Sequence, residues 1–276
     1  MHNNLILATM FIIASACMGL VFIIFWLKNL RETKPFLRVG MTFVLILFLA
    51  EATAIYMIGI DSIGKSLHWI LLLVSMTAVR TYAYTVGGLL LARRLNDVHM
   101  QAASSGYTGS QQTSYGAFVP SMHAVFYALL AVVFMLLYST ILFQLSDAKI
   151  GAALQGKLDL SLGASPVSLL AVATVGFSEE LIFRLGLQNG LAYVWRSARY
   201  GHHWAVLATA AFWSAGHIGS IDPDWVKIAQ IFVFGLLLGQ MNRRFGVVPC
   251  ILTHSLFNVI MVMLVPTIFG DGIIPT

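Results

Sequence analysis

The stretch FSEELIFR, residues 177–184, places two adjacent carboxylates and an arginine inside an apolar run that spans residues 164–195. An ionisable side chain in the middle of a membrane helix costs roughly 3 kcal/mol on insertion scales, so such residues are rare and usually functional. Later apolar runs add His217, and then His254 and Asn258. These polar side chains in apolar surroundings make an enzyme the leading interpretation.

The composition predicts a polytopic membrane protein of the all-α class. Of the 276 residues, 59% are hydrophobic and only 10% are charged, and the mean hydropathy is +0.85. A soluble domain has about 25% charged residues. The net charge is +5, but the cations lie mostly at the ends of apolar segments, which argues against nucleic acid as a partner. Cys17 and Cys250 both lie in apolar runs, so no disulfide framework is indicated.

Several apolar runs approach or exceed the length of about 20 residues that a helix needs to cross a bilayer. The first run has no positive segment before it and no cleavage signal after it, so it is predicted to be a membrane span and not a cleaved signal peptide. We predict about eight transmembrane helices, of which the sixth and seventh are short, at residues 5–27, 39–60, 67–92, 121–145, 165–190, 203–220, 226–241 and 246–268.

The distribution of lysine and arginine predicts the orientation. Loops after the first, third, fifth and seventh spans hold most of the cations, and the positive-inside rule assigns such loops to the cytoplasm. Both termini are then outside the cytoplasm, and the expected location is the plasma (inner) membrane of a bacterium. The glycine-containing segment 146–165 is the best boundary between an N-terminal four-span region of unknown role, residues 1–150, and a C-terminal four-helix core, residues 151–276.

Two charged residues near the middle of consecutive spans stand out in the N-terminal region. Glu51 and Arg80 lie at similar depth if the second and third spans run antiparallel. We predict a buried ion pair between them. It either fixes the register of the two helices or takes part in a proton path or substrate gate.

Helical spacing separates the roles of the two adjacent acids. Glu180 and Arg184 are four residues apart, so they share a helix face and are predicted to form an ion pair. Glu179 points about 100° away from that face. One carboxylate therefore has its own counter-ion, and the other is available as a general acid or base.

The sixth and eighth spans supply the remaining candidates. Small residues flank His217 and permit close helix approach, and Trp213, one turn earlier, is placed to form a pocket wall. His254 and Asn258 share a helix face, so two neutral donors can converge on one point, as an oxyanion site requires. Taken alone, each motif is equally compatible with an ordinary packing or interhelical hydrogen-bonding role.

These three motifs occur in a fixed order over three spans. The pattern Glu-Glu-x-x-x-Arg at 179–184, aromatic-x-x-x-His at 213–217 and His-x-x-x-Asn at 254–258 resembles the CPBP or Abi family of intramembrane glutamic proteases. That family includes CAAX prenyl endopeptidases and bacteriocin-processing enzymes. The likeness extends over about residues 165–264, nearly all of the C-terminal half.

The resemblance implies an intramembrane endopeptidase that uses activated water and needs neither metal nor other cofactor. Its substrate would be a membrane-associated peptide or protein, cut near its C-terminal or membrane-proximal end. Prenylated CAAX tails suit a eukaryotic or archaeal setting; a processed anchor or a bacteriocin leader suits a bacterium. The residues implied are Glu179 and His217 for water activation, His254 and Asn258 for the oxyanion, and Glu180, Arg184 and Trp213 as supporting groups.

Two positions depart from the family pattern. Phenylalanine is usual four residues before the first histidine, where this chain has Trp213, and the glycine that often follows the arginine is replaced by Leu185. Neither change removes a catalytic group. Both changes affect pocket volume and local packing, and therefore the choice of substrate.

Three other interpretations are open. A zinc protease would use the two glutamates and two histidines as ligands, although no His-Glu-x-x-His motif occurs. A cysteine mechanism would pair Cys250 with His254, one turn away. A non-proteolytic protein, either a proton-coupled transporter or an immunity-type binding protein, would use the same polar groups to carry protons or hold a partner. Peptide cleavage that depends on Glu179 and His217 would favour the protease over the non-proteolytic protein.

Overall fold

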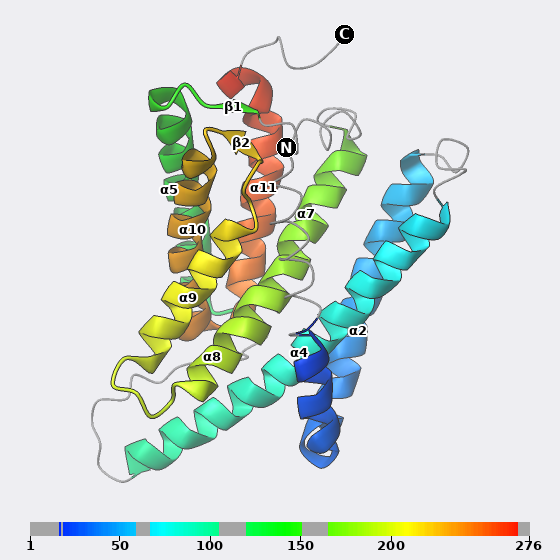
Figure 1. Cartoon of the computed structure of the whole chain (residues 1–276), viewed down its shortest axis with the longest axis vertical. Helices are drawn as coiled ribbons and strands as arrows, with labels where there is room; N and C mark the ends of the chain where they lie inside the picture. The colour runs from blue at the N-terminus through cyan, green and yellow to red at the C-terminus, as the bar shows by residue number, and fades with distance from the viewer. Residues whose placement is uncertain (1–16, 18, 59–66, 105–119, 151–164, 270–276) are drawn as a thin grey trace.

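The chain folds into helices, as the composition predicts (Figure 1). The computed structural model describes residues 17, 19–58, 67–104, 120–150 and 165–269. Two short strands, β1 (Lys149–Ile150) and β2 (Ile221–Asp222), pair antiparallel. The helices are α2 (Leu30–Ile58), α4 (Leu67–Ser104), α5 (Met122–Leu145), α7 (Pro166–Glu180), the π-helix η2 (Leu181–Gln188), α8 (Asn189–Val194), α9 (Gly201–Ala215), α10 (Asp224–Phe245) and α11 (Val247–Phe269).

Most helices coincide with predicted spans, but two helices extend beyond the predicted bounds. α2 begins at Leu30, well before the predicted start at residue 39, and α4 continues to Ser104, beyond the predicted end at residue 92. Within the described part of the chain, four helical segments are long and apolar enough to cross a membrane, namely Leu30–Ala50, Met122–Leu145, Asp224–Phe245 and Val247–Leu264. The number of about eight spans and the orientation therefore stay predictions.

One face of α5 has the character of a lipid contact. Met122 and Leu145 are each 82% exposed and Phe126 is 63% exposed, whereas Ala128 and Met135 on the same helix are fully buried. Large exposed apolar side chains along a long apolar helix are stable in hydrocarbon and unfavourable in water. Together with the four apolar helices, this surface makes the chain an integral membrane protein.

The helix α5 packs beside α10 and α11, although it precedes them by many residues (Figure 1). Gln230 of α10 donates a buried hydrogen bond to the hydroxyl of Ser139 on α5, at 2.8 Å. Thr253 of α11 lies 3.4 Å from the carbonyl oxygen of Ala128. The division of the chain at residue 150 stays a prediction, and α5 packs on helices that follow that point.

Two glycines allow the helices around the motifs to touch. A Cβ atom at Gly176 of α7 would lie 2.9 Å from the backbone nitrogen of Ser255 on α11, closer than real Cβ atoms come. A Cβ atom at Gly88 of α4 would overlap the carbonyl oxygen of Leu185 in η2. Contacts of this kind bring α11 against the end of α7 and α4 against η2, where the acidic motif lies.

Parts of several predictions fall outside the described residues. These are most of the first predicted span and residues 151–164 of the predicted boundary segment. The side chain of Glu51 is also outside the described set, so its ion pair with Arg80 stays a prediction.

Candidate active site

The ion pair predicted between Glu180 and Arg184 is present. Arg184 Nε donates to Glu180 Oε2 at 3.1 Å, and both side chains are completely buried. The other carboxylate oxygen of Glu180 lies 2.8 Å from Nδ1 of His254 on α11. Glu180 therefore connects three helical elements through one buried carboxylate.

The backbone that carries this pair differs from the continuous α-helix that the apolar run predicts. The α-geometry of α7 ends at Glu180 and is followed by the eight-residue π-helix η2, all of whose residues are buried. The side chain of Asn242 on α10 donates to the carbonyl oxygen of Arg184 at 3.2 Å, and Gln188 donates to the carbonyl oxygen of Gly239 at 2.9 Å. The Asn242 bond supports a backbone carbonyl group within η2, and the Gln188 bond ties η2 to α10. π-Helical turns frequently occur at functional sites.

Glu179, which the spacing leaves without a counter-ion on its own helix, has a hydrogen-bond donor from α9. The indole Nε1 of Trp213 donates to Glu179 Oε2 at 2.7 Å. The carboxyl group is partly exposed, unlike that of Glu180. Trp213 is thus more than the pocket wall that the sequence predicts, because it also holds the candidate base.

Trp213 also holds His217. Nδ1 of His217 lies 3.0 Å from the carbonyl oxygen of Trp213, and the two rings meet edge to face with centroids 5.6 Å apart. When Nδ1 carries the proton and donates to this carbonyl, Nε2 is left as an acceptor. His217 interacts electrostatically with both Glu179 and His254.

The indole of Trp213 is the centre of the cluster. It is only 1% exposed, its centroid lies 5.1 Å from that of the His254 ring, and the guanidinium carbon of Arg184 lies 4.8 Å from its centroid. Both candidate histidines and the supporting arginine therefore contact one aromatic ring, and Glu179 bonds to its nitrogen. The structure brings together six of the seven predicted residues in one cluster: Glu179, Glu180, Arg184, Trp213, His217 and His254.

Asn258 lies on the same face of α11 as His254 but bonds elsewhere. Its Nδ2 donates to the carbonyl oxygen of Val172 on α7 at 3.2 Å, and Ser255 donates to the carbonyl oxygen of Ala173 at 2.8 Å. The two neutral donors that the sequence predicts to converge thus have different partners here, since His254 faces Glu180. Asn258 is partly exposed, next to α7.

The thiol of Cys250 is directed at backbone carbonyl oxygens. Its sulfur is fully buried and lies 3.2 Å from the carbonyl oxygen of Leu238 and 3.6 Å from that of Gly246. Among the described residues, no three His, Cys, Asp or Glu side chains are grouped as metal ligands.

Arg80 is a neighbour of the site that sequence reasoning missed. It lies on α4, where it interacts electrostatically with Tyr84 and Glu179. The sequence motifs gave no indication of this contact, since Arg80 precedes Glu179 by about a hundred residues and was predicted to pair with Glu51. The Trp213 bond had a visible signal, because tryptophan has an N–H where the family pattern has phenylalanine.

Comparison with known proteins matches one family to the part of the chain that carries the three motifs. The family model of type II CAAX prenyl endopeptidase Rce1-like proteins matches residues 161–260. This part of the chain is similar to the Rce1-like family. The Rce1-like segment contains α7, η2, α8, α9, α10 and most of α11, and so every predicted site residue. The resemblance to CAAX-type endopeptidases is confirmed over these residues.

One curated relative gives a weaker match. A stretch of 59 residues is 25% identical to the sporulation-killing factor biosynthesis protein SkfC of Bacillus subtilis (strain 168). The match covers 21% of this chain and only 12% of that relative. No solved structure matches the chain.

Proposed function

We propose that this chain is an intramembrane endopeptidase in which Glu179 and His217 activate a water molecule. The main observation behind the proposal is that Trp213 contacts both residues. Its indole Nε1 donates to Glu179 Oε2 at 2.7 Å, and its carbonyl oxygen lies 3.0 Å from Nδ1 of His217. A carboxylate and an imidazole held against one residue suit general acid–base chemistry on a shared water. The Rce1-like match supports the reaction class.

In the proposed reaction, the water oxygen attacks the carbonyl carbon of a peptide bond. The Glu179 carboxylate accepts one water proton, while Nε2 of His217 accepts a hydrogen bond from the same water. When the tetrahedral intermediate collapses, the C–N bond breaks and the proton passes from Glu179 to the leaving amine. The substrate is a membrane-associated protein, cut near its C-terminal or membrane-proximal end.

His254 and Asn258 stabilise the developing oxyanion in this proposal. The Nδ1 proton of His254 is directed at Glu180, at 2.8 Å. Nε2 can therefore donate only from the imidazolium form, which has a proton on both nitrogens. Arg184 fixes in place the Glu180 carboxylate that accepts from His254. For Asn258 to act, its amide must leave the carbonyl oxygen of Val172 when substrate enters.

The test is cleavage by the purified protein in liposomes. Membrane proteins that accumulate uncut in cells with Glu179→Gln, compared with cells holding the parent protein, supply the candidate substrate. Glu179→Gln and His217→Ala should lower the cleavage rate by at least a hundredfold, as loss of a general base does. Glu32→Gln is the matched control, because Glu32 is a partly exposed acid in α2 that pairs with Arg94.

Three results would overturn the proposal. Proton movement through the membrane without turnover of the accumulated protein would favour a transporter, and binding without cleavage would favour an immunity-type protein. Loss of cleavage in a chelator, restored by zinc, would favour a metalloprotease. Unchanged cleavage in the chelator is the expected result.

A further inference from the structure

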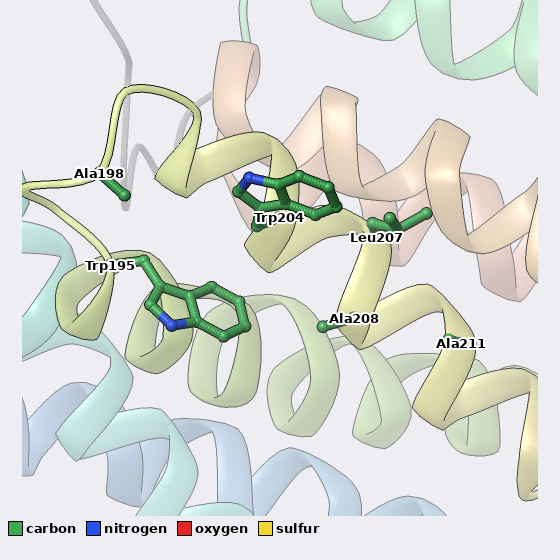
Figure 2. A pocket seen from close by; sticks show the side chains of 6 residues that line it. All are labelled: Trp195, Ala198, Trp204, Leu207, Ala208 and Ala211. Atoms are coloured by element: carbon green, nitrogen blue, oxygen red, sulfur yellow. The ribbon is translucent and has the colours of Figure 1, made fainter.

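A groove on the outside of α9 lies apart from the candidate active site (Figure 2). It has a volume of about 450 Å³, within the usual range of small-molecule sites, roughly 300–1,000 Å³. Figure 2 shows the indole rings of Trp195 and Trp204 on its two sides. All of its lining residues are apolar: Trp195, Ala198, Trp204, Leu207, Ala208 and Ala211.

The groove and the active site use different faces of α9. Trp213 points inward and is 1% exposed, whereas Trp204 and Leu207 are 55% and 39% exposed. Positions 204 and 213 are nine residues apart, which places them on opposite sides of an α-helix at about 100° per residue. An occupant of the groove therefore contacts the back of the helix that carries Trp213, without reaching Glu179.

The loop at one end of the groove carries two arginines, whose guanidinium groups lie over the rings of Tyr193 and Tyr200. Arg196 and Arg199 are exposed on the loop that also supplies the lining residues Trp195 and Ala198. Arg243 of α10 lies 3.0 Å from His203, next to Trp204. The stretch 181–221 contains no Asp or Glu, so no acid from this stretch neutralises the arginines.

We propose that this groove binds an anionic phospholipid, with an acyl chain between the two indoles and the phosphate at Arg196 and Arg199. Tryptophans gather where a membrane protein meets the lipid headgroups. Basic pockets between membrane helices take anionic headgroups. The groove combines both features in one place, with an apolar wall leading away from the cations. A ligand that matches it has a long apolar chain joined to a negative group.

The test is quenching of tryptophan fluorescence by brominated lipids in vesicles, with the whole chain reconstituted. Brominated phosphatidylglycerol should quench more than brominated phosphatidylcholine at the same mole fraction. Trp195→Phe/Trp204→Phe should abolish this excess. Arg196→Gln/Arg199→Gln should lower the relative affinity for phosphatidylglycerol about 30-fold, which corresponds to about 1 kcal/mol for each of two cations.

The matched control is Arg31→Gln/Arg38→Gln, because both arginines are exposed on α2. This variant should keep the preference for phosphatidylglycerol. Equal quenching by the two lipids in the parent protein, or an equal loss in the control, would overturn the proposal. Displacement of the brominated lipid by a farnesylated peptide without phosphate would also overturn it, because the groove would then bind a substrate chain. Displacement by inorganic phosphate alone would overturn it as well, because the groove would then bind a free anion. The assay needs no protease activity, so it stands or falls independently of the proposed reaction.

Discussion

Glu180→Gln removes the negative charge from a pair that the fold buries completely. Both side chains of the pair with Arg184 have 0% exposure, and the N–O distance is 3.1 Å. Two unit charges about 4 Å apart attract by about 4 kcal/mol at an effective dielectric constant near 20. Removing one partner of a buried pair typically destabilises a protein by about 3–5 kcal/mol, because the other charge is left uncompensated. We expect a loss of that size in the free energy of unfolding.

A double-mutant cycle separates the pair from the rest of the cluster. Arg184→Gln leaves the carboxylate of Glu180, which still has His254 at 2.8 Å as a partner that can become a cation. Arg184→Gln should therefore cost less than Glu180→Gln. The double variant Glu180→Gln/Arg184→Gln leaves no uncompensated charge, so its loss should be smaller than the sum of the single losses by about 2–3 kcal/mol.

The chain offers its own reporter of unfolding. The sulfur of Cys250 is fully buried, whereas Cys17 is exposed, so in a Cys17→Ser background a thiol-reactive dye reports exposure of Cys250 on heating in detergent. Glu180→Gln should lower the midpoint by on the order of 10 °C. Glu32→Gln, which breaks a partly exposed pair, should lower it by about 2 °C or less. Equal shifts for these two variants, or strictly additive losses in the cycle, would refute the buried pair.

Three further predictions test other parts of the structure. Trp213→Phe keeps the aromatic wall but removes the donor to Glu179. Because a hydrogen bond to a charged group is worth about 1.5–3 kcal/mol, kcat for cleavage should fall by about 10- to 150-fold with KM little changed. Unchanged kinetics would show that the bond has no role. Gly88→Ala forces a Cβ atom into the carbonyl oxygen of Leu185, so unfolding in detergent should be easier by about 1–3 kcal/mol, and equal stability would contradict the close contact of α4 with η2. Cys250→Ala should leave the cleavage rate within about twofold of the parent, because the thiol faces backbone carbonyl oxygens, and a large loss would revive the cysteine mechanism.

Local features of the sequence were sufficient to predict the helices and the buried pair. The length of an apolar run and the spacing of polar residues on a helix depend on nearby residues only. They place α5, α10 and α11 within a few residues, and they predict the pair of Glu180 with Arg184 that the structure confirms. The order of the three motifs predicted the family that the match over residues 161–260 confirms.

The remaining geometry depends on residues far apart in the chain. The π-helix η2 has support from the side chain of Asn242, which lies 58 positions after Arg184, and no local pattern predicts that bond. His254 was predicted to share one target with Asn258. The prediction considered only the face of α11, whereas the position of α7 decides that His254 meets Glu180 and that Asn258 meets Val172. Tertiary contacts of this kind give different partners to two residues that share one face of a helix.

The candidate site is built from both halves of the chain. The Rce1-like segment begins at residue 161, yet α4, which lies before it, packs its Gly88 on the backbone of η2 and carries Arg80 toward Glu179. Glu179 therefore interacts with two neighbours: Trp213 within the Rce1-like segment, and Arg80 outside it. Substitutions in α4 are therefore expected to change the surroundings of Glu179 while the three motifs stay the same.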